Sequence, residues 1–166
     1  GDLTILINNA GMGSGASSRV DDVAGAAREV FETNLFGPMA LSQALASSLA
    51  ANGGGAIVNV QSILAWMAVP SIDIYSASKA AGWSFTNSLR LQLADQGTQV
   101  VGLYVGWMDT DMADGVDAPK SDPIDIAHQT VAGVEAGAHE AIGDDLSHHV
   151  RDALSGELAG LYPTLS

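Results

Sequence analysis

The sequence contains no cysteine, so neither a disulfide framework nor a cysteine-bound metal site is possible. Its four histidines, at positions 128, 139, 148 and 149, show neither the spacing of zinc ligands nor an HExxH pair. We therefore expect no metal site. The lack of cysteine is in keeping with a cytoplasmic protein, which is the location that we expect.

Positive charge is scarce as well. Six Lys and Arg residues stand against 19 acidic residues, which gives a formal net charge of −13. Such a surface repels polyphosphates, so we expect neither nucleic acid nor an anionic membrane as a partner. The chain also has no apolar run long enough to span a bilayer.

The chain of 166 residues, 47% of them apolar, can bury one core, and we expect a single domain over residues 1–166 with no linker. Nearly continuous apolar runs predict buried strands, and apolar residues at helical spacing predict helices. The expected strands are 3–10, 56–61, 99–106 and 139–143, and the expected helices are 21–49 with a break at Gly37-Pro38, 73–95, 124–135 and 147–158. This alternation predicts an α/β fold with a parallel sheet, whose ligands bind beyond the carboxyl ends of the strands.

Tyr75 and Lys79 are four residues apart in an expected helix, so their side chains lie on one face. An ammonium near a phenol favours the phenolate, and we expect it to lower the tyrosine pKa towards neutrality. A tyrosine adjusted in this way can act as a general acid and base. The pair alone is weak evidence, because this spacing occurs by chance on many helices.

Polar residues also follow the ends of expected strands. Ser62 follows strand 56–61, where its hydroxyl could bind a substrate oxygen or simply stabilise a turn. The segment NNAG at residues 8–11 closes the first strand. Asn34 lies inside a helical stretch, where asparagine is unfavourable, so it indicates a local break with a purpose.

These four motifs, in this order and spacing, resemble the short-chain dehydrogenase/reductase family from about residue 3 to about residue 112. The resemblance implies a three-layer, Rossmann-like α/β fold. In the family the strand order is 3-2-1-4-5-6-7, and the strands expected here correspond to the contiguous block 4-5-6-7. The domain over residues 1–166 would then be a catalytic domain with part of a Rossmann fold.

The resemblance implies a role for each polar residue. Tyr75 corresponds to the catalytic acid and base, and Lys79 to the residue that lowers its pKa and binds the nicotinamide ribose. Ser62 corresponds to the serine that orients the substrate oxygen. Asn34 corresponds to the asparagine that holds a water in a proton relay to the lysine.

The cofactor implied by the resemblance is NAD or NADP. The residues that would contact it are Asn8, Asn9, Ala10, Gly11, Tyr75, Lys79, Gly106 and Thr110. The segment that starts at Gly106 departs from the family pattern, because Val105 stands where proline is usual. We expect its backbone and Thr110 to meet the nicotinamide carboxamide, less rigidly held.

The family's first strand and its glycine-rich TGxxxGxG turn have no counterpart here. The loop at residues 11–18 carries three glycines but does not match GxGxxG. We therefore expect this chain alone to bind a dinucleotide weakly or not at all. Because it begins with Gly1, we expect a fragment, a processed product or a tag remnant. Strand 3–10 would lie at an open edge with Leu3, Ile5, Leu6 and Ile7 facing water, and we expect a second copy, a rearranged segment or a separate N-terminal piece to cover it.

By resemblance the protein is an NAD(P)-dependent oxidoreductase that acts on a small ketone or secondary alcohol as a homodimer or homotetramer. Its rivals are a truncated, inactive structural module and an epimerase or dehydratase, since related enzymes share the Tyr-Lys pair. Five large apolar side chains flank the proposed site and are equally in keeping with a substrate pocket or with core: Trp66, Met67, Trp107, Met108 and Met112.

Overall fold

The computed structural model describes residues 1–13 and 17–165, and their strands form one sheet of order β1-β2-β3-β4. Every neighbouring pair is parallel. The strands are β1 (Ile5–Asn8), β2 (Ala56–Ser62), β3 (Gln99–Val105) and β4 (Glu140–Ile142). The predicted Rossmann-like parallel sheet is confirmed, and the four strands form one contiguous block. Part of the predicted loop at 11–18, residues 14–16, lies outside the described residues.

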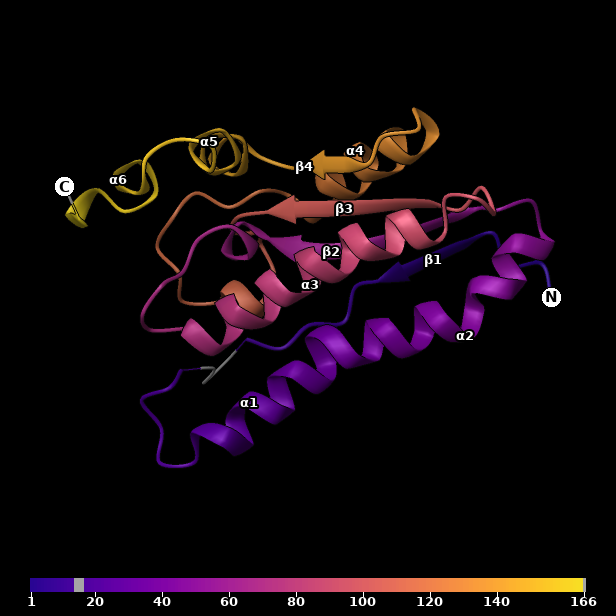
Figure 1. The fold of residues 1–166 in the computed structure, drawn as a ribbon. Helices are drawn as coiled ribbons and strands as arrows, with labels where there is room; N and C mark the ends of the chain where they lie inside the picture. Colours follow the sequence, from indigo (N-terminus) through magenta and orange to yellow (C-terminus); the bar gives the residue numbers. More distant parts are fainter. Residues whose placement is uncertain (14–16, 166) are drawn as a thin grey trace.

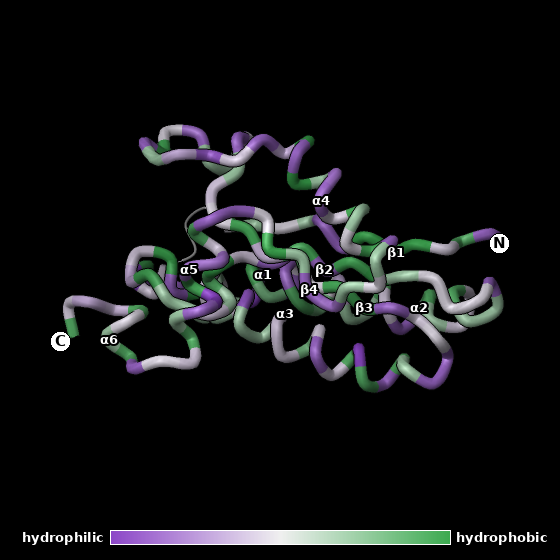
Figure 2. Tube along the Cα trace, turned by 90° about the horizontal axis from the view of Figure 1, so that it is seen from above, coloured by the Kyte–Doolittle hydropathy of each residue, from purple (hydrophilic) through white to green (hydrophobic). Residues whose placement is uncertain are grey.

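Helices cover both faces of this sheet (Figure 1). They are α1 (Val23–Phe31), α2 (Gly37–Ala51), α3 (Asp73–Gln92), α4 (Pro123–Glu135), α5 (Asp145–Ala153) and the short α6 (Leu158–Leu161). Because successive strand residues point to opposite faces, the core divides in two. Ile57 and Val100 pack under α2 and α3, while Val58 and Val101 pack under α4. Apolar segments gather around the central strands (Figure 2).

The expected break at Gly37-Pro38 is wrong, because the chain stays helical from α1 through α2. A π-helical segment, Glu32–Phe36, joins the two helices, and the Gly37 N–H donates to the carbonyl of Glu32 five residues earlier. Proline has no N–H, so it would break a regular ladder, but it fits here in the first turn of α2. The wider π turn thus absorbs the proline without a break in the helix.

The expected helix 147–158 is also wrong in its bounds. The structure has α5 from Asp145 to Ala153, capped by the Asp144 side chain, and then the separate helix α6. A turn closes between them, where the Gly156 N–H donates to the Ala153 carbonyl. Serine and glycine at 155 and 156 favour this turn over a continuing helix.

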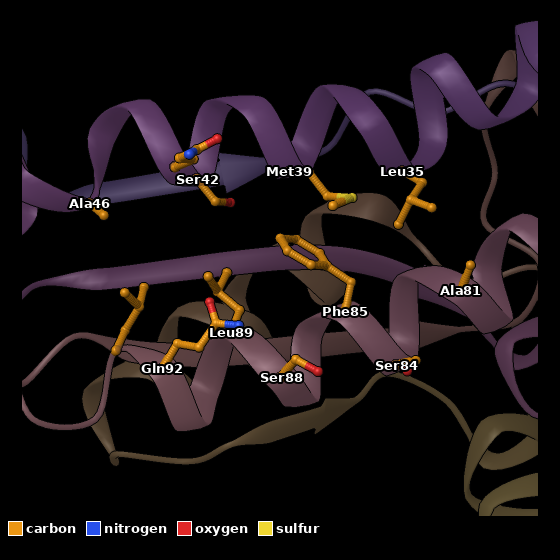
Figure 3. A pocket seen from close by; sticks show the side chains of 12 residues that line it. Leu35, Met39, Ser42, Ala46, Ala81, Ser84, Phe85, Ser88, Leu89 and Gln92 are labelled. Carbon is orange, nitrogen blue, oxygen red and sulfur yellow. The ribbon is translucent and has the colours of Figure 1, made fainter.

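A groove of about 620 Å³ runs between α2 and α3 on the side away from the sheet (Figure 3). Its walls are mostly small or apolar and include Met39, Ala46, Ser84 and Phe85. No charged residue occurs anywhere in α2, although the whole chain carries a net charge of −13. This face is therefore the weakly charged part of an otherwise acidic protein.

β1 lies at the edge of the sheet, as its place in the block predicts. Ile5 and Ile7 are 49% and 57% exposed, because α4 covers β3 and β4 and does not reach them. The expectation that Leu3 and Leu6 also face water is wrong, since both pack against the cluster around Leu49 of α2. The apolar edge is therefore narrower than the sequence predicted.

Amide exchange tests whether another strand covers this edge. The Ala56 N–H donates to the Thr4 carbonyl, so even-numbered residues of β1 face β2 and Ile7 presents its N–H to the open side. We expect the Ile7 amide to exchange slowly in solution because a further strand pairs with it. Leu6, already paired with β2, is the internal control. An Ile7 amide that exchanges freely while Leu6 is protected would show that the edge is open.

Candidate active site

Tyr75 lies in the first turn of α3, and Lys79 follows one turn later on the same face. The Lys79 ammonium is 5.6 Å from the centre of the Tyr75 ring. Only 5% of Lys79 is exposed, and its Nζ donates a hydrogen bond of 2.9 Å to the Val60 carbonyl of β2. A neighbouring strand thus holds the buried lysine beside the tyrosine.

Burial shifts both groups towards their neutral forms. It raises the pKa of the Tyr75 phenol, and the nearby Ser62 hydroxyl opposes that increase. Burial also lowers the pKa of Lys79 to about 8. The predicted fall in the tyrosine pKa is therefore wrong for this chain by itself, because desolvation of the phenolate outweighs the effects that favour it.

Ser62 is the last residue of β2, one position further along the strand than predicted. It is buried, and its hydroxyl accepts a hydrogen bond of 3.2 Å from the Leu64 N–H at the start of a short 3-10 helix. The same hydroxyl favours the ionised form of Tyr75. A structural role and a functional role are therefore compatible for Ser62, since its hydroxyl stabilises a turn and also faces the tyrosine.

Asn34 lies in the π-helical segment and is 3% exposed. Its Oδ1 accepts from the Met12 N–H at 2.8 Å, and its Nδ2 donates to the Met12 carbonyl and to the Ser78 hydroxyl, both at 2.9 Å. The side chain therefore ties the segment after β1 to α3. Its backbone carbonyl has no regular helical donor, because the residue four positions later is Pro38.

The NNAG segment divides into two parts. Asn8 is buried and donates to the Ser42 hydroxyl of α2 at 3.2 Å and to Oδ1 of Asn59 at 2.8 Å. Asn9 and Ala10 are exposed. A Cβ placed on Gly11 would lie 3.8 Å from both Lys79 Nζ and Asn34 Oδ1, so this glycine borders the site directly.

Met112, in the segment after β3, borders the same glycine as Tyr75. A Cβ on Gly13 would lie 3.4 Å from the Tyr75 ring and 3.8 Å from the Met112 sulfur. Thr110 is exposed, and its hydroxyl donates at 3.5 Å to the Met108 carbonyl. The N–H of Gly106 donates to Asp144 at 2.7 Å.

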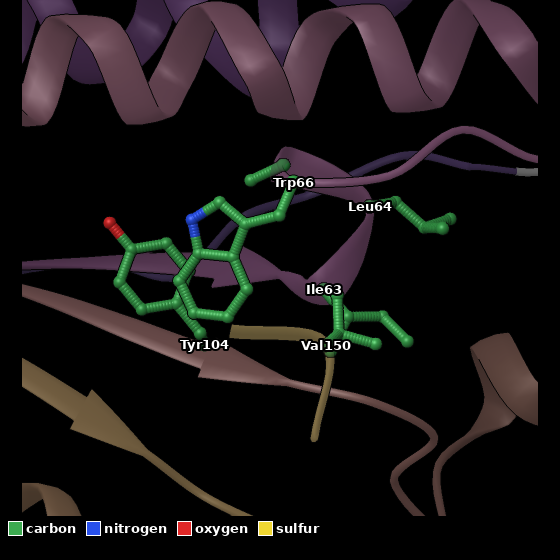
Figure 4. Close-up of a cluster of buried hydrophobic side chains, with 6 residues drawn as sticks. Ile63, Leu64, Trp66, Tyr104 and Val150 are labelled. Carbon is green, nitrogen blue, oxygen red and sulfur yellow. The ribbon is translucent and has the colours of Figure 1, made fainter. Parts of the chain in front are cut away.

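The five apolar residues that flank the site fall into a buried or half-buried group and an exposed group. Trp66 is 6% exposed and stacks on Tyr104 with ring centres 4.2 Å apart, which makes it core (Figure 4). Met67 packs beside that pair, and Met108 packs against the cluster under α4. Trp107 and Met112 are 38% and 56% exposed. Of the five, these last two are the ones that are exposed, whereas Met67 and Met108 are half-buried.

Sequence reasoning missed three polar residues that hold the site together. Asn59 in β2 accepts from Asn8 and donates to Thr86 of α3 at 2.9 Å, and Thr86 donates to the Gly82 carbonyl. An asparagine inside an apolar strand is the signal that could have revealed this chain. Asp144 was missed too, although an aspartate three residues before Ser147 indicates a helix cap.

The family description "short chain dehydrogenase" matches residues 1–121 of this chain. The chain belongs to the short-chain dehydrogenase family. Dehydrogenase/reductase SDR family member 7B of Danio rerio is 32% identical over 148 residues, which cover 81% of this chain and 48% of that protein. The chain thus spans about half the length of this curated relative.

Solved structures of the short-chain dehydrogenase family agree with this fold. A short chain dehydrogenase from Burkholderia cenocepacia in complex with NADP is 35% identical, with a TM-score of 0.91 over 99% of this chain and 71% of that one. A short-chain dehydrogenase from Sphingobium yanoikuyae in complex with NADPH is 26% identical, with a TM-score of 0.79 over 97% of this chain and 65% of that one.

Residues 1–13 and 17–165 lack both a membrane-spanning helix and a cluster of metal ligands. Within these residues, no helix combines the length and the apolar character that a bilayer crossing requires. The same residues include no group of three or more His, Cys, Asp or Glu side chains that could hold a metal ion.

The lowered pKa of Lys79 makes stability depend on pH. From about pH 8 up to the ordinary lysine pKa of 10.5, the unfolded chain binds more protons than the folded one, so the free energy of unfolding rises with pH. Between pH 8 and 10 we expect the wild type to gain about 2 kcal/mol relative to Lys79→Met. Urea unfolding of both proteins across this range measures the difference.

The raised pKa values of Tyr75 and Tyr104 lower stability above pH 10, but both tyrosines are present in both proteins, so their contributions largely cancel. Lys120→Met is the control, since the Lys120 side chain is 22% exposed, against 5% for Lys79, and forms a 4.0 Å ion pair with the exposed Asp109. A constant difference between wild type and Lys79→Met from pH 8 to 10 would contradict the prediction.

Proposed function

We propose that this protein is an NAD(P)-dependent oxidoreductase that transfers a hydride between the nicotinamide and a small ketone or secondary alcohol. The observation that carries the proposal is the meeting of Tyr75, Lys79 and Ser62 at the carboxyl end of β2, in a chain of the short-chain dehydrogenase family. The NADP and NADPH in the Burkholderia and Sphingobium relatives support the choice of cofactor.

The residues present fit the nicotinamide and ribose end of such a cofactor. Lys79 offers a buried amine whose Nζ would lie 3.8 Å from a Cβ on Gly11, so the glycine leaves open the space beside it. Asn9 and Ala10, which are exposed, precede Gly11 along the chain and continue this border. When bound, the nicotinamide would supply or accept the hydride.

Tyr75 moves the proton in this proposal. In the reductive direction its hydroxyl donates a proton to the substrate oxygen as the carbonyl carbon gains the hydride, and in the oxidative direction it takes the proton back. Ser62 orients the same oxygen through its hydroxyl. Lys79 stabilises the phenolate that forms, because a positive charge 5.6 Å from the ring opposes the effect of burial.

Asn34 would hold the water of the proton relay through its backbone carbonyl. Its side-chain amide is already engaged with Met12 and Ser78. The carbonyl lacks a regular helical donor because of Pro38, and a water can bind it in place of an amide. In this arrangement the carbonyl can accept from a water while the side chain of Asn34 keeps its bonds to Met12 and Ser78.

Titration with NADH and NADPH tests the function, and Tyr75→Phe tests the mechanism. We expect Tyr75→Phe to lower kcat by about 10²–10⁴-fold, because the proton donor is removed. Its melting temperature should change little, since the phenol loses only its interaction with the Ser62 hydroxyl. Tyr162→Phe is the matched control, because it also removes one hydroxyl, which accepts from the Ala68 N–H at 2.7 Å.

A Tyr75→Phe protein that turns over at the wild-type rate would refute the role of Tyr75. A wild-type chain that binds neither dinucleotide at millimolar concentration would favour the rival reading, an inactive structural module. The two outcomes are distinguishable, since turnover of Tyr75→Phe tests the role of one residue and dinucleotide binding tests whether the chain can act as an oxidoreductase at all.

We further propose that two copies associate through the groove between α2 and α3, as a homodimer or as part of a homotetramer. The absence of charge from α2 supports this, because two chains of net charge −13 repel each other elsewhere. Small side chains such as Ala46 and Ser84 would let the helices of the two copies approach closely, and Phe85 and Met39 would fill the groove.

Ser84→Glu should abolish this association, because it would bury a negative charge in the interface of each copy. We expect sedimentation velocity at micromolar concentration to give a dimer or tetramer for wild type and a monomer for Ser84→Glu. Gln129→Glu adds the same charge on the exposed side of α4 and should leave the assembly intact. A monomeric wild type would contradict the proposal.

A further inference from the structure

The end of β4 lies very close to the end of β3. The Gly143 N–H donates a hydrogen bond of 2.9 Å to the Tyr104 carbonyl. A Cβ on Gly143 would lie 2.6 Å from Ile126 Cδ1 and 2.9 Å from Val105 Cγ1, which is closer than real contacts allow. A larger residue at 143 would force Ile126 or Val105 to shift, whereas glycine brings the next residue, Asp144, alongside the end of β3 without that shift.

The Asp144 carboxylate binds two backbone amides from different parts of the chain. Its Oδ2 accepts from the Gly106 N–H at 2.7 Å, and its Oδ1 accepts from the Ser147 N–H at 2.8 Å. The second bond caps α5. The first is a charge-assisted bond to the residue that directly follows β3, and such bonds are stronger than neutral ones.

The absence of a side chain at Gly106 makes room for this contact. A Cβ at this position would lie 3.3 Å from Asp144 Oδ1 and 3.3 Å from Leu146 Cδ2, so a larger residue would push the carboxylate away. Neither Val105 nor Gly106 restricts its own backbone as proline would. The direction in which the chain leaves β3 must therefore be fixed by contacts, and Asp144 makes the first of them.

The following residues are held from one side by Ser121. The Ser121 N–H donates to the Trp107 carbonyl at 2.8 Å, and the Asp109 N–H donates to the Ser121 carbonyl at 3.0 Å. These two bonds fix residues 107–109 relative to Ser121 but not relative to the sheet. The bond from Gly106 to Asp144 ties the start of this segment to the residues that follow β4.

We propose that Asp144 is a positioning residue, whose carboxylate fixes the path of residues 106–110 away from β3 and so places this segment against the nicotinamide. The second half of this statement rests on the proposed function. Asp144 acts through its bond to the Gly106 N–H, so the proposal does not require the carboxylate to touch the ligand.

The experiment compares Asp144→Ala and Asp144→Asn with Asp22→Ala in the full chain. Asp22 is the matched control, because it caps α1 by accepting from the Gly25 N–H at 2.8 Å and does not contact residues 106–110. Each variant is studied by amide exchange at residues 106–110, by its melting temperature and by titration with NADPH at a temperature where all remain folded.

For Asp144→Ala we expect exchange at Gly106 to speed up by about tenfold or more and the Kd for NADPH to rise by about tenfold. Asp144→Asn should lie between this variant and wild type, since its single amide oxygen can keep only one of the two sites fully occupied. Asp22→Ala should lower the melting temperature and leave both readouts unchanged.

Unchanged exchange at Gly106 in Asp144→Ala would overturn the proposal, and so would equal acceleration in Asp22→Ala, which would indicate a loss of stability only. Faster exchange with an unchanged Kd for NADPH would overturn the placement against the cofactor. A wild type that binds no dinucleotide would instead favour the inactive structural module over the proposed function of this chain, and exchange at Gly106 would still decide whether Asp144 positions the segment.

Discussion

A buried chain of hydrogen bonds from Ser42 through Asn8 and Asn59 to Thr86 fixes the geometry on which the candidate site depends. Its members come from α2, β1, β2 and α3, and each is less than a tenth exposed. An unpaired amide in such a place would cost about 1–3 kcal/mol, so shifted registers are penalised more strongly than apolar packing alone would penalise them. Because Thr86 belongs to the same helix as Tyr75 and Lys79, this chain also sets the position of that helix along the sheet.

Burial holds the side chains of the candidate site in place and also makes it costly to ionise them. Lys79 is almost fully enclosed and bonds to a strand carbonyl, which keeps its amine in place but disfavours its charge. The Tyr75 phenol is disfavoured as an anion for the same reason. Each group can ionise more easily when the other does, since opposite charges at this distance stabilise each other in a poorly solvated place. The two residues therefore work as a pair, and neither is adjusted by itself.

The sequence predicted the order and type of the strands and long helices well, because apolar runs and helical spacing follow directly from burial on one or two faces. The predictions from sequence were wrong where two physical effects compete at the same residues. Gly37 and Pro38 predicted a break, but a π turn removes the need for the missing N–H. The expected effect of Lys79 on Tyr75 considered charge alone, whereas the depth of both side chains below the surface depends on how β2 packs against α3 and cannot be obtained from spacing.

By itself the sequence determined which residues can do chemistry and in what order they follow the strands, since a parallel sheet brings the ends of its strands to one edge. It placed Tyr75, Lys79 and Ser62 together for that reason. Only the tertiary structure decided what each polar group binds. In the folded chain the Asn34 amide forms hydrogen bonds with Met12 and Ser78, and the Gly106 N–H donates to Asp144, a residue 38 positions away along the chain. These hydrogen bonds form where segments distant in sequence approach each other. That approach depends on how the helices and strands pack, and packing leaves no periodic signal in the sequence.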